Sequence, residues 1–75
     1  MVRTVSEYLL PFRKIRSKVT LAADEIFNVQ LELVTMGNIA AAQKATKIYE
    51  LCHELTDMLK WAETMAKEMA TLANE

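Results

Sequence analysis

The length, composition and charge of the chain exclude several classes of protein. It has 75 residues, of which 52% are apolar and 25% charged, with a formal net charge of −1 and a single cysteine. A chain this short forms one domain of marginal stability unless it associates with another chain. A disulfide within the chain is impossible, no Cys and His residues have the spacing of a zinc site, and the balanced charge excludes both an acidic disordered tail and a strongly basic nucleic-acid module.

The sequence carries no signal for a membrane or for secretion. Its longest apolar runs are far below the ~18 residues that span a bilayer. The start, MVRTVSEYLLPFRK, lacks the long apolar segment and small-residue cleavage site of a signal peptide. We therefore expect a cytoplasmic protein with no membrane partner.

The first ten residues contain two conflicting signals. Thr4 and Glu7 match a capping box, which would begin a helix near Val5. Pro11 would lie inside such a helix, where it removes one hydrogen bond and clashes with the preceding turn, whereas proline suits the first position of a helix. We predict a loose N-terminal turn over residues 1–10 and a helix over residues 11–36.

Apolar residues repeat with a helical period in both halves of the chain. In the first half they follow one another at alternating spacings of four and three, as in Phe12, Ile15, Val19 and Ala22, and a second such series runs from Ile48 to the C-terminus. Residues 27–34 (FNVQLELV) also alternate like a strand, but the sequence offers no second strand to pair with them.

The only glycine of the chain separates the two helical patterns. Gly37 suits the left-handed position after a helix, and Asn38 is a natural N-cap for the next helix. We place the turn at residues 36–38 and the second helix at residues 39–73. The whole chain, residues 1–75, is then a single antiparallel helical hairpin.

The apolar face of each predicted helix is too wide for one partner helix to cover. We therefore predict an all-α fold in which two hairpins associate as a four-helix bundle, with the chain itself as partner in a homodimer. The predicted oligomer core consists of Ile15, Val19, Ile26, Leu33, Ile48, Leu51, Leu55, Met58, Met65 and Met69.

Some apolar residues lie outside this core pattern. Phe27, Leu31 and Val34 lie on the side of the first helix that a simple bundle keeps polar. One explanation is that the hairpin bends or that neighbouring subunits cover them. The other is that they form a docking patch for a second, unidentified protein, because contiguous exposed apolar surface is rarely left without a partner.

A basic cluster near the N-terminus supports an alternative function. Arg13, Lys14, Arg16 and Lys18 could contact phosphates of RNA or DNA. They point in different directions around a helix, and in an antiparallel hairpin they would instead face Glu63, Glu68 and Glu75. Nucleic acid is therefore a possible but less favoured partner.

Three carboxylates lie on one side of the second helix. Glu50, Glu54 and Asp57 are spaced to hold Mg²⁺ together with substrate phosphates. The segment ELTDML resembles the E-x-x-D helix of all-α nucleotide pyrophosphatases of the MazG type, and the resemblance implies Mg²⁺-dependent phosphohydrolysis. The family also has E-x-x-E on an earlier helix, whereas Glu25 is followed at that place by Asn28.

The alternative for these carboxylates is an ordinary solvated helix face with i to i+3 pairing to lysines. His53 is expected on the surface and Cys52 as a packed thiol. We predict no catalytic residue, metal or cofactor. The expected function is that of a small non-enzymatic interaction or regulatory (adaptor) protein.

Overall fold

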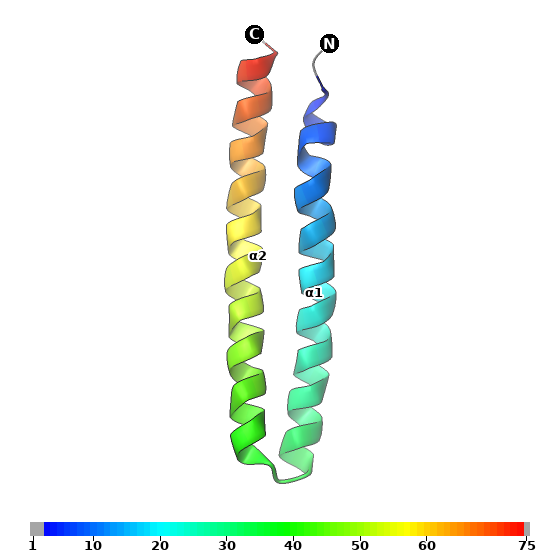
Figure 1. Ribbon diagram of the computed structural model, residues 1–75, viewed down its shortest axis with the longest axis vertical. Helices are drawn as coiled ribbons and strands as arrows, with labels where there is room; N and C mark the ends of the chain where they lie inside the picture. Colours follow the sequence, from blue (N-terminus) through cyan, green and yellow to red (C-terminus); the bar gives the residue numbers. More distant parts are fainter. Residues whose placement is uncertain (1–2, 75) are drawn as a thin grey trace.

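The computed structural model describes residues 3–74 and consists of two long helices joined by a short turn. Helix α1 spans Val5–Thr35 and helix α2 spans Ile39–Ala73. The helices run antiparallel, so that the start of α1 and the end of α2 lie at the same end of the molecule, opposite the turn (Figure 1). The all-α hairpin is confirmed, and residues 27–34, which also have a strand-like pattern, are part of α1.

The molecule is a rod rather than a compact particle. Its principal extents are 58 × 14 × 10 Å, and its radius of gyration is 17.3 Å, against about 11 Å for a compact chain of this length. Among residues 3–74, neither helix contains a stretch that is apolar enough to cross a lipid bilayer.

The turn forms where the glycine and asparagine predict it. Gly37 has φ +78°, and its N–H donates to the carbonyl of Val34 at 3.0 Å while that of Asn38 donates to Leu33 at 2.9 Å. These two bonds form a Schellman motif, which satisfies carbonyls that the end of α1 would otherwise leave unpaired. The Asn38 side chain then accepts from the N–H of Ala41 at 3.2 Å and caps α2.

The predicted loose turn over residues 1–10 is wrong for the described part of that segment. Thr4 is the N-cap of α1, its Oγ1 accepting from the N–H of Glu7 at 3.2 Å, and Pro11 lies inside the helix. Leu9 explains why the helix continues through the proline. It is only 2% exposed. Because α2 is the only other helix within residues 3–74, Leu9 must pack on α2, and its burial offsets the hydrogen bond lost at Pro11.

The interface between the helices follows one heptad series on each of them. The buried and half-buried positions of both series alternate at spacings of three and four. On α1 they are Leu9, Phe12, Arg16, Val19, Ala23, Ile26, Gln30 and Leu33, and on α2 they are Ala42, Ala45, Tyr49, Cys52, Thr56, Leu59, Glu63, Ala66 and Ala70.

Small and polar side chains are common in this interface. Four alanines of α2, including Ala45 and Ala66, are buried there. Gln30 Nε2 donates to Thr46 Oγ1 at 2.7 Å, beside the apolar contacts near the turn. Such polar contacts at core positions favour one register of the two helices at some cost in stability.

Replacing the glycine of the turn tests the Schellman motif. An added Cβ at Gly37 meets no atom within 4 Å, so that the cost of Gly37→Ala is the left-handed backbone itself, about 1 kcal/mol. Gly37→Asn should cost less, because asparagine visits this region more readily. Urea unfolding at one fixed protein concentration measures both, and equal midpoints for the natural chain and Gly37→Ala would contradict the assignment.

Removing the proline from α1 should stabilise the protein. Pro11→Ala restores an N–H to the Glu7 carbonyl and removes the ring clash, so that we expect a gain of about 1–3 kcal/mol in the free energy of unfolding. Ser17→Ala, at an exposed position in the interior of the same helix, is the matched control and should gain only a few tenths of a kcal/mol. A Pro11→Ala variant no more stable than this control would show that α1 does not pass through Pro11 as described.

Candidate functional site

A row of large apolar side chains remains uncovered along the hairpin. We call this row the outer seam, and its members are 39% to 75% exposed. It comprises Ile15, Val29, Met36, Ile48, Leu51, Leu55, Met58, Met65, Met69 and Leu72.

The outer seam follows one side of the rod. Most of its residues come directly before a residue of the hairpin interface, as Val29 precedes Gln30 and Ile48 precedes Tyr49. Equivalent positions of two antiparallel helices lie on the same side of the pair. The shape of the surface supports this placement, because one open apolar depression is lined by Val29 of α1 together with Ile48 and Cys52 of α2.

A second apolar depression lies on the same side, nearer the open end. Phe12 of α1 lines it together with Ala62, Met65 and Met69 of α2. The two depressions place uncovered apolar surface in both halves of the rod. Uncovered apolar surface therefore lies along both halves of the hairpin on this side, and this face is the leading candidate for a binding surface.

The residues predicted for the oligomer core divide between two places. Three of them, Val19, Ile26 and Leu33, lie half-buried between the helices, while the other seven are exposed on the outer seam. On α2 the flanking column that contains Ala45, Cys52 and Leu59 packs inside the hairpin instead. Sequence hydrophobicity does not identify the column that packs inside the hairpin. It favours the larger residues of the outer seam over the alanines, although the alanines are what permit close helix packing.

The patch of Phe27, Leu31 and Val34 is also exposed, at 44%, 52% and 50%. Phe27 and Val34 directly follow interface residues, so that they lie on the side of the hairpin opposite the outer seam. The Phe27 ring contacts that of Tyr49 at 5.7 Å between centroids, and Tyr49 meets His53 edge-on at 4.4 Å. The patch is thus a second, smaller apolar surface near the turn.

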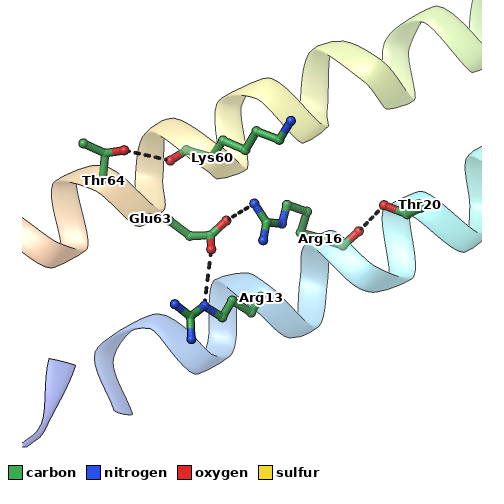
Figure 2. A network of polar contacts seen from close by, with 6 residues as sticks. All are labelled: Arg13, Arg16, Thr20, Lys60, Glu63 and Thr64. Atoms are coloured by element: carbon green, nitrogen blue, oxygen red, sulfur yellow. Dashed lines mark hydrogen bonds and ion pairs between the residues drawn. The ribbon is translucent and has the colours of Figure 1, made fainter. Parts of the chain in front are cut away.

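A buried carboxylate holds two members of the basic cluster. Glu63 is 7% exposed, with its Oε1 3.6 Å from Arg13 Nε and its Oε2 2.9 Å from Arg16 Nη1 (Figure 2). No donor within residues 3–74 is aligned on Oε2 as a hydrogen bond. The contact therefore stabilises mainly through charge.

The remaining members of the basic cluster point elsewhere. Lys14 and Lys18 are exposed, and neither forms an ion pair in the described part of the chain. Of the acidic residues expected to face the cluster, Glu63 does so, no such pair forms at Glu68 within residues 3–74, and Glu75 lies outside them. The cluster does not form a continuous cationic strip, because its two arginines are turned towards α2.

The three carboxylates of α2 remain on an exposed helix face. Glu50, Glu54 and Asp57 are all exposed, and residues 3–74 hold no group of three or more His, Cys, Asp or Glu side chains arranged to bind a metal ion. Cys52 is half-buried between the helices and His53 is exposed.

Comparisons of the chain with protein-family models, with curated proteins and with solved structures find no match.

Neutralising the buried carboxylate tests its ion contacts. Glu63→Gln leaves two arginines without their counter-charge, and because both arginines are partly exposed, we expect a loss of about 1–2 kcal/mol rather than the 3–5 typical of a fully buried pair. Glu50→Gln, an exposed carboxylate on the same helix, should change the free energy by less than about 0.5 kcal/mol. Urea unfolding measures the free energy of unfolding of both variants, and equal losses would contradict a stabilising role for the ion contacts of Glu63.

Proposed function

We propose that this protein is a small non-enzymatic interaction module that associates with itself as a four-helix bundle and offers the Phe27 patch to another protein. The observation that carries the proposal is the uncovered outer seam. Exposed apolar surface of this extent marks an interaction site in soluble proteins.

The total surface of the hairpin supports association. The accessible area is 5844 Å², whereas a monomeric protein of 8.5 kDa exposes about 4,650 Å². The excess is about 1,200 Å² per chain, more than the roughly 800 Å² that each partner buries in a stable complex of standard size. A second hairpin laid on the outer seam is therefore sufficient to bring the exposed area into the usual range.

The Phe27 patch supports an adaptor role. It lies on the side of the hairpin away from the outer seam, so that it stays accessible when the outer seam is covered. A dimer then carries two such patches. This arrangement joins two partner molecules, which is what an adaptor does.

Solution mass tests self-association. We expect the natural chain to sediment at twice 8.5 kDa at micromolar concentration. Leu55→Lys, on the outer seam, should shift it to monomer, because a charge buried in the interface is not compensated. Leu31→Lys is the matched control on the opposite side and should leave the dimer intact. A natural chain that is folded and monomeric would overturn the proposal.

The adaptor role is tested separately with Phe27→Ser/Leu31→Ser. We expect this variant to remain a dimer and to lose a protein that the natural chain captures from lysate. A variant that loses the dimer as well would show that the Phe27 patch belongs to the oligomer core.

The nucleic-acid alternative is supported by the exposed Lys14 and Lys18 alone, because Glu63 holds the arginines. Binding to RNA or DNA that weakens steeply with added salt would favour it.

A further inference from the structure

We propose that two copies of this chain dock through the outer seam with their long axes antiparallel, so that the turn of one copy lies beside the open end of the other. This inference rests on the proposed self-association and adds its geometry. The twofold axis crosses the rods near their midpoint, which packs α1 on α1 and α2 on α2.

One column of mostly apolar residues along α1 is evenly spaced on either side of Ala22. Tyr8, Ile15, Ala22, Val29 and Met36 form one column with a spacing of seven. In an antiparallel pair centred on Ala22, each Ile15 meets a Val29 and each Tyr8 meets a Met36. The smallest residue of the column is then at the axis, where two helices must approach most closely.

On α2 the twofold axis passes near Met58, at about the same height along the rod as Ala22 on α1. A column centred on Met58 pairs Leu51 of one copy with Met65 of the other. The contacts Phe27 to Tyr49 and Arg16 to Glu63 fix the register of the hairpin. They bring Ala22 level with a point on α2 within about one helical turn of Met58. One axis therefore serves both helices.

The charges of the rod favour this direction. Residues 3–20 and 57–74 form the open half and contain seven basic and four acidic side chains, a net charge of +3. Residues 21–56 form the turn half and contain two basic and five acidic side chains, a net charge of −3 with histidine neutral. Antiparallel docking places each positive half beside a negative half, whereas parallel docking places like charges together.

Two pairs along the edges of the outer seam carry this complementarity. With the same centres, Lys18 of one copy faces Glu25 of the other on α1, and Lys47 faces Glu68 on α2. All four side chains are exposed, and none forms an ion pair within residues 3–74 of a single copy. Glu25 also lines the apolar depression near Val29, so that it lies at the edge of the proposed interface.

A distance between copies tests the direction of docking. A spin label on Gln43→Cys, in a Cys52→Ala background whose dimeric mass is checked first, lies on an exposed position near the turn. Antiparallel docking puts the two labels on the order of 45 Å apart along the rods, from the helical rise. A label separation below about 25 Å, the width of a four-helix bundle, indicates parallel docking and overturns the inference.

The outcomes separate this inference from the proposed function. A dimeric mass with a short label distance contradicts only the antiparallel geometry. A monomeric mass contradicts self-association itself and leaves a helix of a different protein as the occupant of the outer seam.

Charge reversal provides a second test. Lys47→Glu places two acidic residues opposite each other at both symmetry-related pairs along the α2 edge, and we expect the dimer dissociation constant to rise about tenfold at low salt. Adding Glu68→Lys restores the pair and should restore the affinity. Lys60→Glu, on the other side of α2, is the control and should change the constant less than about twofold. Failure of Glu68→Lys to compensate would overturn the proposed pairing.

Discussion

The structure depends on how each helix divides its apolar residues between two adjoining seams. We call the row of interface residues on each helix its inner seam. The inner seam of α2 is built from alanines, with Tyr49, Cys52, Thr56, Leu59 and Glu63 between them, and it packs against α1. The larger residues, such as Leu51, Met58 and Met65, lie on the outer seam and remain exposed. A single hairpin thus buries its small residues and leaves its largest apolar ones exposed to water, and this imbalance is the physical basis of the proposed association.

The polar contacts between the helices give the hairpin a defined register. Gln30 meets Thr46 near the turn, and Arg13 and Arg16 meet Glu63 near the open end. Sliding one helix along the other by a turn would separate these partners and leave Glu63 buried without a counter-charge. The polar positions therefore trade some stability for a single alignment. That alignment also sets the outer seam, because it decides which residues of α1 and α2 lie side by side.

The sequence was sufficient to predict the two helices and the turn, because Gly37 and Asn38 act through local backbone chemistry. It was not sufficient to predict the start of α1, since a local rule about Pro11 was overridden by the burial of Leu9 on a helix far away in the sequence. The inner and outer seams of α2 were also not distinguished. Both have heptad spacing, and only the packed pair shows that alanines suit the narrow space between two helices. The burial of Glu63 also does not follow from the sequence, because it depends on which column of α2 packs against α1. Its pairing with the basic cluster does follow from the antiparallel arrangement.

Most directly, the central claim is tested by the melting temperature at different protein concentrations. If covering the outer seam is what completes the fold, unfolding is coupled to dissociation, and a hundredfold increase in concentration should raise the melting temperature by several degrees. A single melting temperature from micromolar to hundred-micromolar concentration, with a particle of 8.5 kDa throughout, would contradict the account.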